Sequence, residues 1–181
     1  GGEKLKYLRN INVGITGQWK QLIRRIQPLV TDFKFRVDSQ ERVLVNKGVY
    51  AAEYTGPAGQ KSVFRTPSSI NVRYNNNASL DSDVLSSTAL TADSFYLFLL
   101  GPLAWEEWQN NVTRLRNQNM NGKPHWRVYI NKQPGLGLSR DDEIVLWVDP
   151  QSKLTTRVQI TLKGHESTKV AHVEVDYLDY K

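Results

Sequence analysis

The spacing of hydrophobic residues changes along the chain and predicts its elements. Near the N-terminus apolar residues recur every three or four positions, which is the period of one helix face. These residues are Leu5, Leu8, Ile11, Ile15, Trp19, Leu22 and Ile26. Gly14 and Gly17 interrupt the stripe, and each costs a helix up to about 1 kcal/mol relative to alanine. We therefore predict a helix over 16–27, ending before Pro28, with helix or extended chain before it.

From Asp32 onward the period is two, which indicates half-buried strands. Phe33, Phe35 and Val37 alternate with polar residues, and similar runs continue to Tyr74. The turns between these runs lie about ten residues apart, as is typical of an antiparallel meander. Alternation resumes at Trp126. The pattern predicts strands over 32–74 and over 124–180.

The middle of the chain has a helical pattern. After a polar stretch over 75–87, Thr91 is a candidate N-cap for a short apolar helix that ends at Gly101. We predict a helical insert over 91–118, which includes Trp105 and Trp108. The expected fold is mainly β (α+β): a single curved antiparallel sheet, or incomplete β-barrel, with an N-terminal helix and an inserted helical lid.

Length and composition fit one ordinary soluble domain over 1–181. The chain has 181 residues, 39% of them hydrophobic and 23% charged, which excludes a disordered or collagen-like protein. No apolar run approaches the roughly 18 to 20 residues that cross a bilayer. There are no cysteines, so disulfides, thiol catalysis and cysteine-based metal sites are excluded.

The net charge of +6 is concentrated at one end. Residues 1–30 hold six basic residues against Glu3 alone, a balance of +5. A basic helix can meet an anionic membrane surface, although a solvated polar face is the plainer interpretation. No nucleic-acid recognition motif accompanies the charge, so we expect no nucleic-acid partner.

Motifs for catalysis are missing from the sequence. His125, His165 and His172 lie in separate elements, and none has a second metal ligand at a suitable spacing. No nucleophile elbow, dinucleotide loop or phosphate loop is present. The acidic residues at 141–143 and at Glu174 and Asp176 are best interpreted as a solvated strand face. We therefore expect no enzyme, no metal and no cofactor.

Large apolar and aromatic residues remain as the candidate site. A curved sheet that helices cover without filling encloses a cavity. Ordinary core packing is the alternative for each residue, because strand register decides which face looks inward. The candidate cavity-lining residues are Phe33, Phe35, Val72, Phe95, Leu99, Trp105, Trp108, Trp126 and Trp147.

Several short motifs resemble the outer-membrane lipoprotein-sorting (LolA/LolB-like) group of periplasmic proteins. The order of elements is similar, and the motifs extend over most of the chain. They are the runs 35–38, 53–57, 98–103, 142–150 and 154–158, Gly164, and the end of the last strand at 177–180. The resemblance implies an incomplete antiparallel barrel with a helical lid over a hydrophobic cavity. It also implies a bacterial envelope protein, periplasmic or outer-membrane-associated in a Gram-negative bacterium, whose signal peptide has been removed.

Two functions follow as hypotheses. The first is a non-enzymatic carrier or binding protein for a lipid, an acyl chain or an acylated lipoprotein. The alternative is an interaction module that docks an envelope partner protein or the membrane surface through the basic helix or an aromatic patch. A hydrolase built on scattered acids is the third.

Overall fold

The protein is mainly antiparallel β-structure with one long helix, as the sequence predicts. The computed structural model describes residues 7–100 and 112–178. These divide into two compact units, 1–99 and 100–181. The first contains a six-stranded sheet and the second a five-stranded sheet. The predicted single curved sheet is thus two sheets in the described residues. The assignment of the whole chain to one domain stays a prediction.

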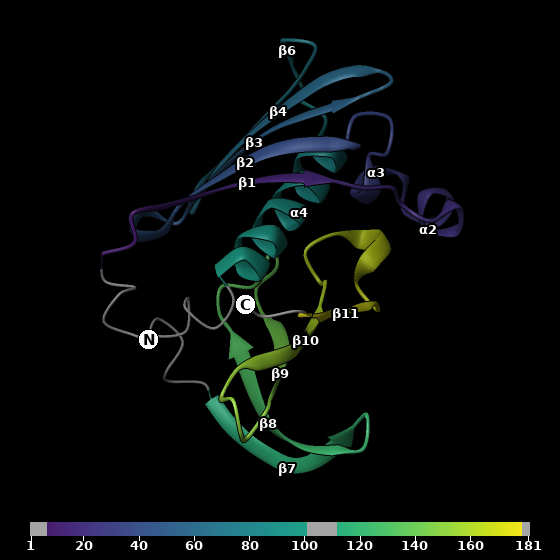
Figure 1. Ribbon diagram of the computed structural model, residues 1–181. Helices are drawn as coiled ribbons and strands as arrows, with labels where there is room; N and C mark the ends of the chain where they lie inside the picture. Colours follow the sequence, from purple (N-terminus) through teal and green to yellow (C-terminus); the bar gives the residue numbers. More distant parts are fainter. Residues whose placement is uncertain (1–6, 101–111, 179–181) are drawn as a thin grey trace. The chain divides into compact units, whose positions relative to one another are not determined.

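The first sheet is a meander whose strands pair in chain order (Figure 1). Its strands are β1 (Asn10–Thr16), β2 (Asp38–Leu44), β3 (Val49–Gly56), β4 (Gly59–Thr66), β5 (Ser69–Tyr74) and β6 (Asn77–Ala78). Short helices α2 (Gln21–Ile26) and α3 (Pro28–Thr31) follow β1, η1 (Val45–Lys47) follows β2, and α4 (Ser82–Leu100) follows β6. Every pairing between neighbouring strands is antiparallel.

Helix α4 lies across one face of this sheet (Figure 1). Hydrogen bonds of three of its side chains tie the helix to the sheet and the turn after β2. The Lys61 ammonium donates to Thr88 Oγ1 at 3.1 Å, and the Arg65 guanidinium donates to Asp93. Tyr96 donates from its hydroxyl to the Val45 carbonyl. The face beneath α4 is therefore the inner face of the first unit.

Strand pairing aligns the inner residues in rows across the sheet. One row is Ile15, Ser39, Tyr54, Lys61 and Tyr74, and the next is Val13, Glu41, Ala52, Val63 and Val72. The first of these rows is mostly polar, whereas the second is apolar except for Glu41. Buried polar groups need partners, because an unpaired one costs about 1–3 kcal/mol. The inner face is therefore unusual for a protein core.

The N-terminal helix is shorter than predicted. Residues 10–16 form β1, and the helical part begins at Gln21. In β1 the residues Ile11, Val13 and Ile15 alternate with Asn12 and Gly14, so the same apolar residues also satisfy a period of two. The β-branched side chains favour a strand there, and Gly14 weakens a helix.

The start of the first predicted strand region is wrong. Phe33 and Phe35 lie in a turn, since the amides of Phe35 and Arg36 both donate to the Asp32 carbonyl. Asp32 itself has a left-handed φ of 42°, which ends α3. The turn packs closely on the β3–β4 hairpin: a Cβ at Gly56 would lie 2.4 Å from the Lys34 carbonyl oxygen, so that position requires glycine.

The helical insert also begins earlier and ends earlier than predicted. The Asp81 carboxylate caps α4 by accepting from the amides of Asp83 and Val84, whereas Thr91 lies inside the helix and donates to the Ser87 carbonyl. Residues 112–118, predicted as helix, belong to strand β7. Trp105 and Trp108 lie outside the described residues. No helix in the described part is long and apolar enough to span a membrane.

The second sheet is a meander in the order β11-β10-β9-β8-β7. Its strands are β7 (Val112–Met120), β8 (Lys123–Lys132), β9 (Asp142–Val148), β10 (Thr155–Thr161) and β11 (His172–Asp176), with η3 (Glu166–Thr168) before the last. These strands agree with the predicted strand region over 124–180, apart from β7. One face is apolar, with Ile130, Ile144, Leu146, Val158 and Ile160 buried.

Asp142 organises the loops at one end of this sheet. Its fully buried carboxylate accepts from the Leu136 and Lys163 amides and from the hydroxyls of Ser139 and Thr161. One side chain thereby joins the β8–β9 loop, β10 and the residues that follow β10. Hydrogen bonds to an ionised carboxylate are stronger than bonds between neutral groups, and four donors use the full acceptor capacity of its two oxygens.

Replacing Asp142 with alanine is expected to destabilise the second unit by about 3 kcal/mol, because several buried donors lose their acceptor at once. Urea unfolding followed by tryptophan fluorescence measures the change. The matched control is Asp176→Ala, which removes an exposed ion pair with Arg157 and should cost less than about 1 kcal/mol. Equal costs for the two variants would contradict the role assigned to Asp142.

Candidate functional site

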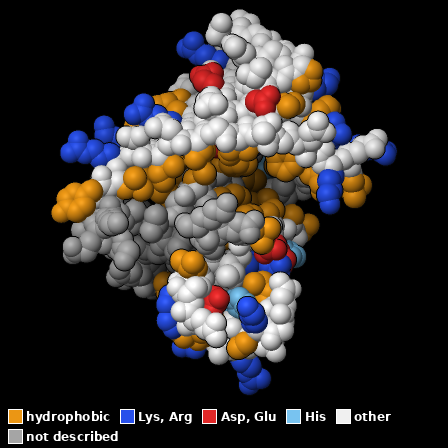
Figure 2. All heavy atoms as spheres, in the orientation of Figure 1, with side chains coloured by type: hydrophobic (Ala, Val, Ile, Leu, Met, Phe, Trp, Pro, Cys, Tyr) orange, Lys and Arg blue, Asp and Glu red, His pale blue; other side chains and the backbone are white. Residues whose placement is uncertain are grey.

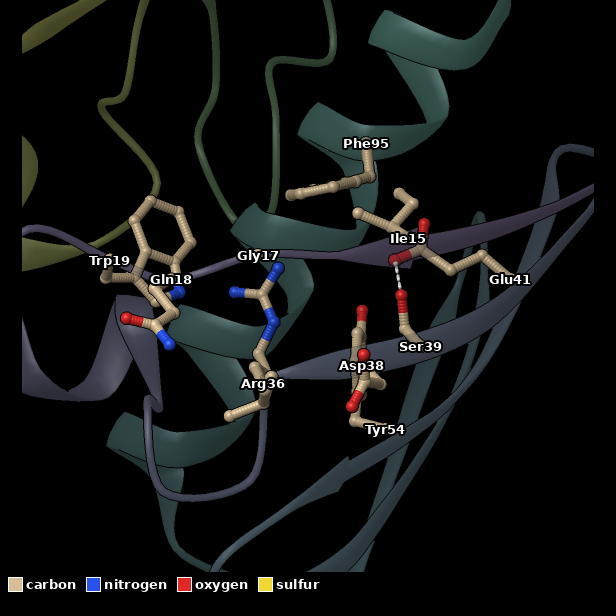
Figure 3. A pocket seen from close by; sticks show the side chains of 11 residues that line it. Ile15, Gly17, Gln18, Trp19, Arg36, Asp38, Ser39, Glu41, Tyr54 and Phe95 are labelled. Atoms are coloured by element: carbon tan, nitrogen blue, oxygen red, sulfur yellow. Dashed lines mark hydrogen bonds between the residues drawn. The ribbon is translucent and has the colours of Figure 1, made fainter.

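A pocket of about 200 Å³ opens in the first unit, where the end of β1 meets the turn before β2 (Figure 3). Strands β1, β2 and β3, the segment that enters α2, and helix α4 each contribute to it. The lining residues are Ile15, Gly17, Gln18, Trp19, Arg36, Val37, Asp38, Ser39, Glu41, Tyr54 and Phe95. Its walls include aromatic and aliphatic side chains, with one cation and two carboxylates among them.

Period-two alternation places the polar lining residues. In β2, Ser39, Glu41 and Val43 are buried, whereas Gln40 and Arg42 are exposed. In β3, Tyr50 and Tyr54 are on the same inner face. The register pairs Ser39 with Tyr54, so the polar ends of neighbouring strands meet at the pocket.

Arg36 lies among three aromatic rings. Its guanidinium carbon is 5.0 Å from the centre of the Tyr54 ring, 5.1 Å from that of Phe95 and 5.6 Å from that of Trp19. The guanidinium donates to the Val30 carbonyl at 2.9 Å, which holds the turn in place. Its Nε is buried without a hydrogen-bond partner among the described residues. The cation is therefore held by ring faces, and one donor is left over.

Glu41 is 3% exposed and lines the same pocket. One carboxylate oxygen accepts a 2.8 Å hydrogen bond from the Ser39 hydroxyl, which Figure 3 shows as a dashed line. The other oxygen, Oε2, is buried without a hydrogen-bond partner within the described part of the chain. An acceptor of this kind is costly to bury unless something donates to it.

Two tyrosines connect the charged groups beneath the pocket. The hydroxyls of Tyr50 and Tyr54 are hydrogen-bonded at 2.7 Å. Burial raises the pKa of Tyr50 far above its ordinary value, with smaller contributions from Tyr54 and Glu41. Burial also raises the pKa of Tyr54, against the opposing effect of the Arg36 cation. Both phenols thus stay neutral in the folded protein.

A neighbouring ion-pair cluster braces the pocket. The Lys61 ammonium is 2% exposed and lies 2.7 Å from the Asp32 carboxylate, which also accepts from the Tyr74 hydroxyl. Burial lowers the pKa of Lys61, against the attraction of Asp32. Because Asp32 begins the turn that carries Arg36, this cluster fixes the turn to the sheet. Its polar groups are mutually satisfied, so it is a structural element.

Among the candidate cavity residues that the structure describes, only Phe95 lines this pocket. Val72 is buried in the sheet core, and Leu99 is half-buried near the end of α4. Phe33 lies beneath the Arg24 guanidinium, at 5.3 Å, and Phe35 packs edge-on against Tyr74, with ring centres 4.6 Å apart. Their role in binding stays a prediction.

Trp126 and Trp147 lie in the second unit, in adjacent strands. Lys153 and Arg114 contact the Trp126 ring, at 4.1 Å and 5.3 Å from its centre. Trp147 is buried, and its indole donates to the Gln159 side chain. The Trp126 ring is therefore in contact with two cations, and the Trp147 indole is hydrogen-bonded to an amide. Neither tryptophan is among the residues of the pocket.

Sequence reasoning missed Trp19, Arg36, Glu41 and Tyr54 as site residues. The signal for Glu41 was present, since it occupies the same phase as Val43 in an alternating run. For Trp19 and Arg36 there was none, because both flank irregular segments whose path depends on packing. Among the acidic residues interpreted as a solvated strand face, Asp142 is fully buried, so that interpretation is wrong for it. The others are in ion pairs: Asp141 and Glu143 with Lys163, and Glu174 and Asp176 with Arg157.

Comparisons with known proteins leave the family open. No family model matches the chain, and no curated protein matches it. Among solved structures, the crystal structure of the Mycobacterium tuberculosis lipoprotein LppX is similar, with 13% sequence identity and a TM-score of 0.31. The match covers 90% of this chain and 85% of that chain. A TM-score of this size does not establish a shared fold, so the lipoprotein-sorting resemblance stays a hypothesis.

The buried tyrosines make the stability of the folded protein depend on pH in the alkaline range. In the unfolded chain tyrosine ionises near pH 10.0, whereas the folded state holds its proton to higher pH. Above that pH the folded state binds more protons, so the stabilisation is complete below pH 10.0 and is lost as the pH rises. The free energy of unfolding should fall more steeply between about pH 9 and about pH 11 for the wild type than for Tyr50→Phe. Urea titrations at the two pH values measure it, and Tyr129→Phe in β8 is the control. Identical slopes for wild type and Tyr50→Phe would disprove the assignment.

Proposed function

We propose that the protein is a non-enzymatic binding protein for a lipid or acyl chain, and that the pocket of the first unit holds the apolar end of that ligand. The observation that carries the proposal is the pocket itself. Ile15, Trp19 and Phe95 present apolar surface to a space of about 200 Å³. Such a space with few convergent polar groups is the usual form of a small-molecule site.

The size of the pocket limits what it accepts. Pockets for drug-sized ligands hold about 300–1,000 Å³, and this one is smaller. It suits one short chain, or the end of a longer chain whose remainder lies outside. Each buried methylene contributes about 0.8 kcal/mol, so about six contribute about 5 kcal/mol before the cost of association is subtracted. We therefore propose that binding is reversible, which a carrier needs in order to release its ligand.

The envelope setting belongs to the same proposal. A carrier in the periplasm or at the outer membrane would take up a lipid or acylated protein and release it without chemistry. This rests on the motif resemblance described for the sequence.

Straight-chain alcohols of increasing length test the pocket. Affinity, measured by calorimetry, should rise about fourfold per methylene until the space is filled and should then level off. Ile15→Trp fills the pocket from β1 and should end the rise at a shorter chain. Phe64→Trp is the control, because Phe64 is exposed on β4 and is not among the lining residues. Chain-length dependence that ignores Ile15→Trp would exclude this pocket. Native mass spectrometry of protein purified without detergent would identify a natural ligand.

A second candidate function, docking to an anionic membrane surface, is favoured by the residues that follow Trp19. Leu22, Ile26 and Leu29 are 66%, 56% and 40% exposed on α2 and α3. Lys20 and Arg25 are exposed beside them. Figure 2 shows lysine and arginine side chains projecting near hydrophobic ones on this face of the first unit. Apolar residues flanked by basic ones are typical of segments that lie in the lipid interface.

Sedimentation with vesicles tests this second function. The wild type should bind vesicles that contain anionic phospholipid more tightly than neutral ones, and salt should weaken that binding. The double variant Leu22→Ser, Ile26→Ser should bind at least about tenfold more weakly, because it loses two apolar side chains that would enter the lipid interface. Leu80→Ser is the matched control, since Leu80 is 90% exposed elsewhere in the unit. Binding that the double variant retains would reject the surface.

A further inference from the structure

The Glu41 carboxylate defines the chemistry of the ligand that the pocket accepts. Glu41 lies in a row across the sheet whose other members, Val13, Ala52, Val63 and Val72, are all apolar. Its Oε1 accepts from Ser39, and its Oε2 has no donor among the described residues although the side chain is 97% buried.

The side chain that carries the unpartnered oxygen lines the pocket. Glu41 is one of the lining residues, and Figure 3 shows its carboxylate end beside Ile15 and the Ser39 hydroxyl. Asp142, the other buried acid among the described residues, has four donors. Glu41 differs from it in lining a pocket while one carboxylate oxygen has no donor. A hydrogen-bond donor on a ligand would satisfy it.

Charge decides which donor fits. The Arg36 guanidinium also lines the pocket, and both Arg36 and Glu41 act on the Tyr54 hydroxyl with opposite sign. The lining carries one cation, Arg36, and two carboxylates, the buried Glu41 and the exposed Asp38. A carboxylate ligand would be repelled by both acids and an ammonium by Arg36, whereas an uncharged donor meets neither repulsion. The ring faces that would hold an ammonium are already in contact with Arg36.

We propose that the pocket selects an uncharged, hydroxyl-bearing amphiphile, whose hydroxyl donates to Glu41 Oε2 while its apolar chain packs against Ile15, Trp19 and Phe95. An oxygen on the same head group accepts from the unpartnered Arg36 Nε. This inference rests on the proposed function and adds the class of ligand. Fatty alcohols and singly acylated polyols belong to that class, and ionised fatty acids do not.

Three probes of one chain length test the selection: octanol, octanoate and octylamine, titrated into the intact protein at neutral pH. Octanol should bind about tenfold more tightly than octanoate, because a hydrogen bond to a buried charged group contributes that much. In Glu41→Gln the amide oxygen keeps the bond from Ser39, while the amide nitrogen replaces the free acceptor with a donor. That variant should lose about tenfold in octanol affinity and should gain affinity for octanoate.

The matched control is Glu53→Gln, which makes the same change at an exposed position of β3. Circular dichroism and urea unfolding show whether each variant is folded. If Glu41→Gln does not fold, the ranking of the three probes on the wild type decides alone.

The other outcomes overturn the inference in separable ways. Tightest binding of octylamine, lost in Glu41→Gln, would make Glu41 a cation site. Equal affinities that Glu41→Gln leaves unchanged would reject the selection but keep the proposed function, provided that Ile15→Trp still reduces binding. If none of the probes binds, both the selection and the proposed function are wrong.

Discussion

Charged side chains lie on the inner face of the first sheet, and each has to be partnered there. Helix α4 covers that face, so Lys61 and Arg65 are nearly removed from water. Asp32 and Thr88 pair with Lys61, and Asp93 pairs with Arg65 at two oxygens. Removing one member of such a pair leaves an uncompensated buried charge. This destabilises the fold far more than replacing the whole pair with apolar residues would. This requirement determines where the turn after α3 and the helix are placed.

The pocket lies where that pairing is incomplete. The turn held by Asp32 brings Arg36 over three rings, and β2 brings Glu41 beneath them. Each retains one polar atom without a hydrogen-bond partner in the described residues. A protein optimised only for stability would satisfy or remove such groups. Their retention beside an apolar-walled space is what supports ligand binding over a purely structural role.

The acidic side chains of the second sheet, unlike Glu41, are partnered. Asp142 accepts four hydrogen bonds, and the acids of the outer face are paired with Lys163 and Arg157. Trp126 and Trp147 are likewise occupied by cations or by a hydrogen-bonded amide. These acidic side chains are thus engaged in holding strands together. No group of three or more metal-binding side chains occurs among the residues that the structure describes.

The sequence by itself determined the secondary-structure class and most strand positions, because alternation with a period of two is a local property of β-chains. It also determined that Glu41 shares the phase of Val43, and it singled out Phe95. It did not determine the secondary structure around Ile11 and Ile15. These two residues fit a helix stripe and, together with Val13, also fit a strand. Only the tertiary structure decided that these residues form β1 against β2, that Phe33 and Phe35 leave the sheet in a turn, and that the strands divide into two sheets. It alone brought Trp19 and Arg36 to Glu41, because contacts between irregular segments depend on long-range packing that leaves no periodic signal in the chain.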